Sequence, residues 1–340
     1  KDDMLRKFQS ARNTEIRERI WEDLLEHELG QAEFMLLMLT TQSKEEYALT
    51  IKIYEKARAR VKPTGAMLNS AIDAYGAERD FEKALDVFDE YEDLAPRDLN
   101  AYNACILALS LSPHEHHFDR AVELFGDIDE ANLTADEVSY HGVLQSCKTH
   151  GKWRLGLELL DLMDREDDLK SDKVAHVLAL GACSVGAKEK GKAEAAKLVF
   201  QSMEQKGLVR DESAYEPLIL ALEIGGAHAE AIDLFNDMQK RDLQWTTKIY
   251  NSIIRTLAQM RLYDAGQELF DKMTTTGLSP DAETYAALFL NCKRGGEFER
   301  ALEALEEATE SGIQPTKEMY EGLIESAARN AKKDEAVEYF

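Results

Sequence analysis

The sequence has few of the residues that mark several common protein classes. It holds only 4 cysteines among 340 residues, and none forms a Cys-x-x-Cys pair, so nothing indicates a disulfide framework or a cysteine-bound zinc ion. Its 6 prolines and 19 glycines exclude collagen-like and low-complexity chains. The longest purely apolar run, near 34–39, is too short to cross a membrane, so we expect no membrane insertion.

Basic residues are also in deficit. Lys and Arg number 41 against 65 Asp and Glu, which gives a net charge of −24. A uniformly acidic surface repels phosphate, so this composition argues against non-specific binding of nucleic acid and favours a basic protein partner. The hydrophobic fraction of 44% is sufficient for a buried core and excludes a disordered chain.

A turn signal recurs along the chain at a fixed interval. Gly277-Leu278-Ser279-Pro280-Asp281 is followed 35 residues later by Gly312-Ile313-Gln314-Pro315-Thr316, and the same register extends upstream. The predicted repeats span 30–64, 65–98, 99–136, 137–172, 173–211, 212–246, 247–281 and 282–316, with a partial copy over 317–340. A constant period of this length is typical of solenoid proteins.

Each repeat contains two helical patterns. In 247–281 the first places Tyr250, Ile253, Ile254 and Leu257 on one face, and the second does the same for Ala265, Leu269, Phe270 and Met273. One helix pair cannot bury both faces, whereas stacked neighbours can. The sequence therefore predicts an all-α fold, an α-solenoid superhelix of helix-turn-helix repeats. Residues 1–29 are predicted to form an N-terminal capping helix, followed over 30–340 by about eight repeats and a truncated last copy.

Several positions inside the repeats keep one residue type. Position four is tyrosine and position twenty is alanine in most copies, at Tyr102, Tyr140, Tyr215, Tyr250, Tyr285 and Tyr320 and at Ala84, Ala121, Ala196, Ala231, Ala301 and Ala336. The Trp-x-x-Leu-Gly-x-x-Tyr signature of tetratricopeptide repeats is missing. With their 35-residue period, residues 30–340 resemble the pentatricopeptide repeat family, in its P-type form.

The resemblance implies a groove that binds single-stranded RNA with one base per repeat. In the family, position five and the last residue of the repeat read the base, and Asn with Asp favours uracil. The sequence carries this combination three times, as Asn69 with Asp98, Asn103 with Asp136, and Asn251 with Asp281, and a fourth polar pair is His141 with Asp172. With the family's parallel direction, the three Asn/Asp pairs imply the RNA sequence 5′-U-U-x-x-x-U.

A second interpretation of these residues stays open. The reading code is eroded elsewhere, because Val177, Glu216 and Ala286 occupy position five. Asn and Asp also suit turns and helix N-termini, so the pairs can persist as caps. If position five faces the groove, Asn251→Ala is expected to weaken RNA binding and to leave folding intact.

Charge is divided unevenly between the two helices of a repeat. Basic and acidic residues nearly balance over the predicted first helices, whereas the second helices carry acidic clusters such as Glu303, Glu306 and Glu307. Because first helices line the groove in the family, the resemblance implies a near-neutral groove and an acidic outer face. Lys148, Lys293 and Arg294 match the family's basic positions at the end of the first helix, and we expect them to contact phosphate.

Motifs for catalysis are missing. His114-Glu115-His116-His117 is the only metal-like string, but no Cys-x-x-Cys follows it as in the family's editing deaminases, and its spacing does not fit a zincin. We interpret it as a polar inserted turn. No Gly-rich phosphate loop or nucleophile elbow occurs, so we predict no catalytic residue, no metal and no cofactor.

Two functions follow from these features. The first is a non-enzymatic protein that binds single-stranded RNA in its groove for RNA processing, stability or translation. The second is an acidic scaffold that docks basic protein subunits of an organellar complex, such as a ribosome or transcription complex. The resemblance implies a plastid or a mitochondrion. Since the chain begins at Lys1 rather than at methionine, we expect that a targeting segment has been removed.

Overall fold

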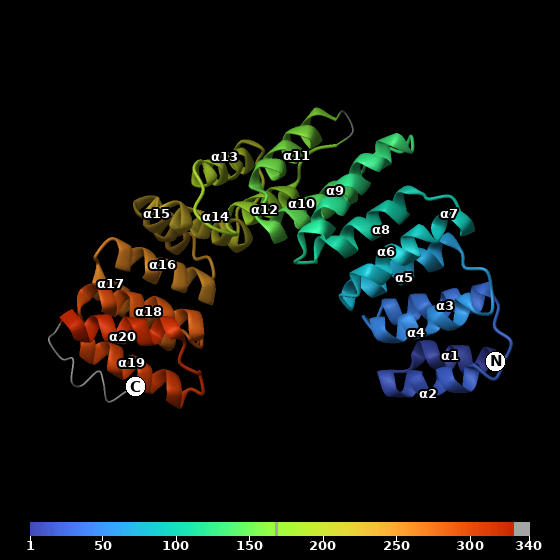
Figure 1. Ribbon diagram of the computed structural model, residues 1–340, viewed down its shortest axis with the longest axis horizontal. Coiled ribbons are helices and arrows are strands. Elements are labelled where there is room, and N and C mark those ends of the chain that lie inside the picture. The colour runs from blue at the N-terminus through green and yellow to red at the C-terminus, as the bar shows by residue number, and fades with distance from the viewer. Residues whose placement is uncertain (167–168, 330–340) are drawn as a thin grey trace. The chain divides into compact units, whose positions relative to one another are not determined.

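The computed structural model describes residues 1–166 and 169–329. Every regular element in these residues is a helix, which confirms the all-α prediction. The chain divides into two compact units, Lys1–Ser171 and Asp172–Phe340 (Figure 1). The division falls at the predicted boundary between two repeats.

The first unit contains the helices up to α11. Their bounds are α1 Asp2–Ser10, α2 Thr14–Leu24, α3 Gln31–Gln42, α4 Tyr47–Arg58, α5 Gly65–Ala77, α6 Phe81–Asp89, α7 Tyr91–Leu94, α8 Leu99–Ser110, α9 Glu115–Glu130, α10 Glu137–His150 and α11 Trp153–Arg165. The first helices of its repeats are α3, α5, α8 and α10, and each packs against the next. The second helices are α4, α6, α9 and α11, and α7 is a short extra turn after α6.

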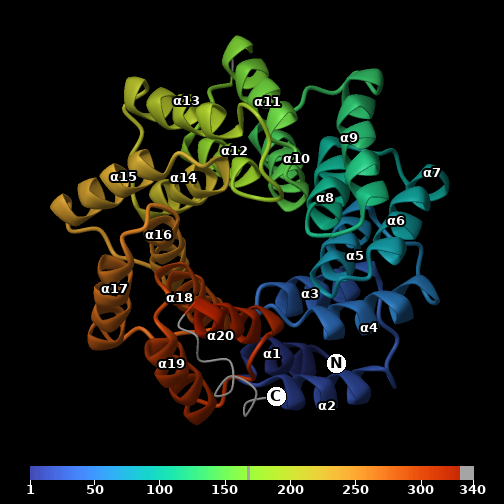
Figure 2. The same ribbon diagram turned by 60° about the vertical axis from the view of Figure 1, so that its left-hand side comes forward.

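The second unit repeats the same arrangement. Its helices are α12 Lys173–Cys183, α13 Lys192–Gln205, α14 Glu212–Gly225, α15 His228–Lys240, α16 Thr247–Gln259, α17 Tyr263–Thr275, α18 Ala282–Gly295, α19 Phe298–Glu310 and α20 Lys317–Arg329. The first helices α12, α14, α16, α18 and α20 lie side by side as one layer. Within this unit the second helices α13, α15, α17 and α19 form the other layer, on the outside of the curve (Figure 2). Residues 330–340, the end of the predicted truncated copy, lie outside the described residues.

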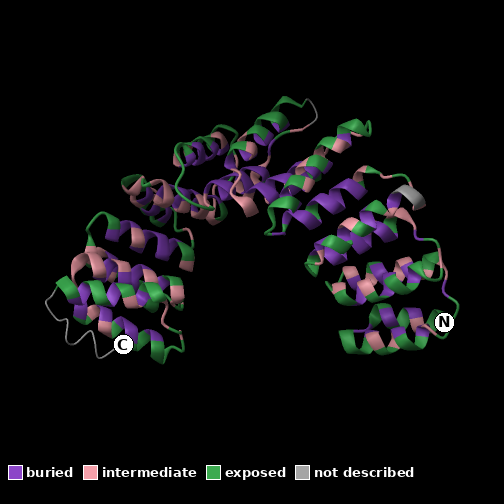
Figure 3. Cartoon of the chain, viewed as in Figure 1, coloured by how far each residue is buried: buried purple, intermediate pink, exposed green. Residues whose placement is uncertain are grey.

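The buried residues follow the predicted stripes. Tyr250, Ile253, Ile254 and Leu257 of α16 are all buried, as are Leu269, Phe270 and Met273 of α17. Within each unit, first helices are buried on more than one side, because they contact their own second helix and the neighbouring first helices of the same unit (Figure 3). Five of the tyrosines at position four are buried, namely Tyr102, Tyr140, Tyr215, Tyr250 and Tyr285. All of these except Tyr250 pack edge-on against a phenylalanine ring of the preceding second helix. The rings of Phe200 and Tyr215, for example, have centroids 5.0 Å apart.

Two local predictions differ from the structure. Residues 1–29 form two helices, α1 and α2, because Ala11 is extended and Asn13 caps α2 by accepting a hydrogen bond from the Ile16 amide at 3.0 Å. The inserted turn expected at 113–117 is shorter than predicted. Helix α9 begins at Glu115, so His116 and His117 belong to its first turn.

Close approach of two first helices gives a stability prediction. A Cβ atom on Gly76 of α5 falls 2.5 Å from the Cβ of Ala108 on α8 and 2.8 Å from its Cα. Because the second contact is with backbone, Gly76→Val is expected to force the helices apart and to cost about 1–3 kcal/mol of unfolding free energy. Chemical denaturation measures this loss.

A second glycine supplies the matched control. Gly126 lies inside α9, and a Cβ there meets nothing within 4 Å. Gly126→Ala is therefore expected to raise the unfolding free energy, by up to about 1 kcal/mol, through helix propensity alone. If Gly76→Val leaves stability unchanged, the close contact between α5 and α8 does not exist in solution.

Candidate nucleic-acid interface

The aspartates at the predicted repeat ends are helix caps. The Asp98, Asp136, Asp172 and Asp281 carboxylates each accept a hydrogen bond from the backbone amide three residues later, at 2.8–3.0 Å. An Asp at this position satisfies an amide that has no partner inside the helix, and its charge interacts favourably with the helix dipole. The capping interpretation of these residues is therefore confirmed.

Two of the predicted Asn/Asp pairs also meet across the repeat boundary. The Asn103 side-chain amide on α8 donates to Asp136 at 3.0 Å, and that of Asn251 on α16 donates to Asp281 at 3.2 Å. Ser139 adds a hydrogen bond from its hydroxyl to the Asn103 carbonyl oxygen at 2.7 Å. Each aspartate thus caps one repeat and fixes the amide of the repeat before it.

The pair of Asn69 and Asp98 is arranged differently. Asn69 accepts a hydrogen bond from the Tyr91 hydroxyl, and among the described residues no hydrogen bond joins Asn69 to Asp98. The Tyr91 hydroxyl also donates to the Gly65 carbonyl, at 2.7 Å, so the short helix α7 is tied to the start of α5. His141 belongs to the first unit and Asp172 to the second, and each is described within its own unit.

Burial distinguishes the three asparagines. Asn69 is half-buried, Asn103 is 5% exposed, and Asn251 is completely buried. The carbonyl oxygen of the Asn251 side chain has no hydrogen-bond partner among the described residues. Asn251→Ala therefore removes a buried hydrogen bond, and we expect the variant to fold with an unfolding free energy lower by about 1 kcal/mol.

Two further polar links join neighbouring repeats. The Thr246 hydroxyl donates to the Glu216 carboxylate at 2.6 Å, so these residues, which the repeat register pairs but which depart from the Asn/Asp combination, make the same contact as Asn251 and Asp281. Sequence reasoning missed the second link, in which Arg255 on α16 donates twice to Glu223 on α14, at 2.7 and 3.1 Å. The spacing of about one repeat is the signal that points to Arg255 and Glu223, and it does not specify which side chains reach each other.

Position two of the repeat is open to solvent throughout the array. The exposed residues there are Ala66, Asn100, Val138, Val174, Ser213, Lys248 and Glu283. Each lies three residues before position five, so positions two and five share one face of the first helix. The aliphatic residues Val138 and Val174 are 43% and 49% exposed and offer apolar contact to a flat ligand.

The predicted phosphate-binding residues lie on the same helices. Lys148 follows His141 by seven residues, and Lys293 follows Ala286 by seven, so both share the position-five face of their helices. Lys293 pairs with Glu325 at 2.6 Å. No ion pair joins Lys148 or Arg294 to a described residue, and both side chains are half-buried.

The four cysteines and the tryptophans belong to the packing. Cys105, Cys147, Cys183 and Cys292 are buried free thiols, and burial raises the pKa of each to about 12. A thiol with this pKa is a poor nucleophile at neutral pH. Trp21 and Trp153 are buried, and Trp245 packs on Phe235 with 4.6 Å between ring centroids. The tryptophans therefore lie in intramolecular contacts.

The capping pairs make stability depend on pH. Burial raises the pKa of Asp136, but the Ser139 amide and the Asn103 side chain outweigh it, so the pKa lies below its ordinary value of 3.8. A carboxylate with a lowered pKa stabilises the fold fully above the pKa of the unfolded chain and loses this effect as pH falls through the folded pKa. Asp136→Ala is expected to cost about 1 kcal/mol at pH 7. The difference from the parent should shrink below about pH 4.

Denaturation at pH 7 and at several values below 4 measures this change. Asp129, an exposed residue near the end of α9, supplies the control variant Asp129→Ala, which removes a carboxylate without removing a cap and should change the unfolding free energy at pH 7 by less than about 0.5 kcal/mol. If the difference between Asp136→Ala and the parent does not change with pH, the charged cap is contradicted.

Comparison with known proteins identifies the repeats. A family model described as "Pentatricopeptide repeat domain" matches residues 233–294 and 268–330, and one described as "PPR repeat" matches 66–94. A chloroplastic pentatricopeptide repeat-containing protein of Arabidopsis thaliana is 27% identical over 52% of the chain and 17% of its own length. A mitochondrial one from the same plant is 26% identical over 55% of the chain and 44% of its own length. The chain thus spans less than half the length of these two relatives.

A solved structure shares the fold. The crystal structure of the pentatricopeptide repeat protein PPR10 in complex with an 18-nt psaJ RNA element aligns with a TM-score of 0.51 at 15% identity, covering 99% of the chain and 59% of PPR10. At this identity the similarity concerns the helical architecture. No helix in the described part of the chain has the length and apolar character needed to cross a membrane.

Proposed function

We propose that this chain, which is built from pentatricopeptide repeats, binds single-stranded RNA along its first helices and acts in RNA processing, stability or translation. The observation that supports this most directly is the contact of Asn103 with Asp136 and of Asn251 with Asp281 across the repeat boundary. In each pair the aspartate uses one hydrogen of the amide group and fixes its orientation. The second hydrogen of the same amide group can donate a hydrogen bond to a carbonyl oxygen of uracil.

Stacking and phosphate contacts complete the proposed interface. The exposed position-two residues flank the base, with Val138 and Val174 as apolar surfaces. Lys148 and Arg294 each supply positive charge on a first helix of their own unit. Base reading by the fully buried Asn251 requires that its amide become accessible in the complex. The proposed role is binding, without catalysis, and the organelle is a plastid or a mitochondrion.

The first experiment is a titration of the chain with short single-stranded RNAs. One probe carries 5′-U-U-x-x-x-U, and three others replace one of the uridines by adenosine. We expect the parent to prefer the first probe, and the variant Asn103→Ala to lose the preference at the second uridine only, by about tenfold. Binding without any uridine preference, or an Asn103→Ala variant that keeps the preference at the second position, rejects the proposed reading of bases.

The acidic second helices favour a second candidate function. Glu303, Glu306 and Glu307 on α19 are all exposed, and so are Asp86 and Asp89 on α6. A surface of this charge complements a basic protein subunit. If the chain binds neither probe at low salt, docking to such a subunit becomes the leading function, and a pull-down with basic proteins of the organelle tests it.

A further inference from the structure

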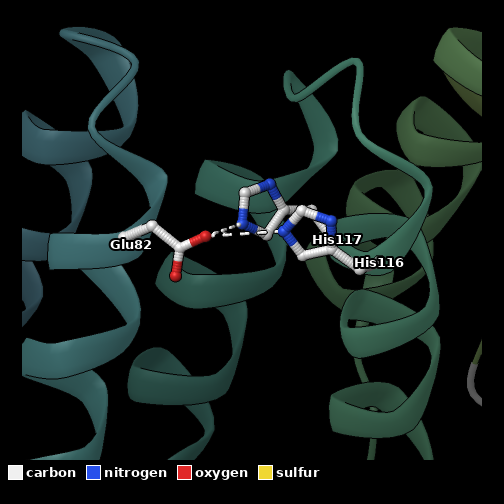
Figure 4. Close-up of side chains that lie close together, drawn as sticks. All are labelled: Glu82, His116 and His117. Carbon is white, nitrogen blue, oxygen red and sulfur yellow. Dashed lines mark hydrogen bonds and ion pairs between the residues drawn. The ribbon is translucent and has the colours of Figure 1, made fainter.

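The string of histidines that the sequence assigned to a polar turn lies beside a carboxylate of the preceding repeat. Glu82 lies in the first turn of α6, and His116 and His117 lie in the first turn of α9. One oxygen of the Glu82 carboxylate lies 3.2 Å from Nε2 of His117 and 3.4 Å from Nε2 of His116. Figure 4 shows the carboxylate pointing at both imidazole rings.

These separations fit the edges of a metal-coordination tetrahedron. Ligand atoms about 2.0–2.1 Å from a zinc ion in tetrahedral geometry lie about 3.4 Å from one another. The three potential ligand atoms all lie within 4.8 Å of each other. Two imidazoles and one carboxylate are also a ligand set that zinc accepts when water fills the fourth position.

His117 is held in place by residues behind it. Its ring is 2% exposed, packs edge-on against Phe81 at 5.4 Å between centroids, and shares a hydrogen bond of 2.6 Å between Nδ1 and the hydroxyl of Ser112. Metal-binding histidines commonly have such a partner at their second nitrogen, because it orients the ring and fixes the tautomer.

The other two ligands are accessible from solvent. His116 and Glu82 side chains are 65% and 74% exposed, so an ion can enter and both can adjust to it. The nearby Glu115 is paired with Lys152. His114 stacks on His116 with ring centroids 5.6 Å apart.

We propose that Glu82, His116 and His117 bind a zinc ion that joins the second helices of two neighbouring repeats. The ligands come from α6 and α9, and Glu82 precedes His117 by 35 residues, which is one repeat. The ion therefore clamps consecutive repeats from outside, on the face opposite the proposed RNA groove. This role is independent of base reading.

Zinc binding to the metal-free, full-length chain tests the proposal. A chromophoric chelator competes for Zn²⁺, and the melting temperature is measured with and without the ion. We expect one site whose affinity for Zn²⁺ is much higher than that of exposed carboxylates elsewhere on the surface, and a melting temperature that rises when zinc is added. His116→Ala is expected to weaken this site about 100-fold and Glu82→Gln at least tenfold, and both should abolish the rise in melting temperature.

Two exposed residues supply matched controls. His27→Ala removes a histidine outside the cluster, and Asp86→Asn removes a different acid from α6, so both should bind zinc as the parent does. His117→Ala is less informative because the ring is buried, and the test therefore depends on His116 and Glu82. A parent without a tight site, or a His116→Ala variant with the parent's affinity, overturns the proposal.

Discussion

Replacing Ala231 by aspartate is expected to unfold the region around α15, with a loss of about 4 kcal/mol or more in unfolding free energy. Ala231 is 0% exposed, and α15 packs against both α14 and α16. The substitution takes a carboxylate out of water in a space that holds a methyl group, and burying a charge is among the most destabilising effects of a single substitution. Because each repeat depends on its neighbours, α14 and α16 should lose protection together with α15.

Hydrogen exchange of the backbone amides and a thermal melt measure both parts of this prediction. Ala229 lies on the same helix two residues earlier but is exposed, so Ala229→Asp introduces the same charge without burying it. We expect the melting temperature of that variant to equal that of the parent or to lie slightly above it, because a negative charge in the first turn interacts favourably with the helix dipole. A parent-like melt for Ala231→Asp contradicts the assignment of position twenty to the core.

Reversing the charge of Lys148 and Arg294 together is expected to lower RNA affinity on the order of 100-fold at low salt. Both lie near the end of a first helix, and neither has an ion pair with a described residue, so their charge is available to phosphate. Each lost phosphate contact should also reduce the slope of log affinity against log salt by about 0.7 for a single strand. The double variant Lys148→Glu/Arg294→Glu should therefore have a slope shallower by about 1.4.

A control with the same change of net charge separates contact from long-range repulsion. Lys56 on α4 and Lys240 on α15 are exposed residues of second helices, one in each unit. Lys56→Glu/Lys240→Glu should weaken binding by only a few-fold at low salt and leave the slope nearly unchanged. If both double variants behave alike, Lys148 and Arg294 do not contact the backbone of the RNA.

Features that repeat along the chain were predictable from the sequence. The helical stripes, the buried tyrosines and the buried cysteines recur in register, and a hydrophobic period determines which face of a helix is covered. The caps at Asp98, Asp136, Asp172 and Asp281 also follow from local chemistry, since an aspartate before a helix is a strong start signal. Asn13 is the same kind of start signal, and it explains why residues 1–29 form two helices where one was expected.

Contacts that break the repeat were not predictable. Tyr91 reaches Asn69 because the extra turn α7 brings its hydroxyl toward α5, and α7 has no counterpart in the other repeats over the residues that the structure describes. The link between Glu82 and the histidines depends on where α9 begins, which differs from the predicted turn by a few residues. One residue of shift rotates a side chain by about 100° around a helix, so such contacts require the coordinates.

The polar links between first helices have a consequence for how such a chain changes its length. Asn103 with Asp136, Glu216 with Thr246, Glu223 with Arg255, and Asn251 with Asp281 are each separated by about one period, 30–33 residues, and each joins consecutive repeats. Deleting or duplicating one whole repeat between two junctions of this kind keeps the linked positions about one period apart. A DNA segment that encodes one period can therefore be lost or duplicated there, and the new junction still places a polar residue at position five next to the residue that ends the repeat.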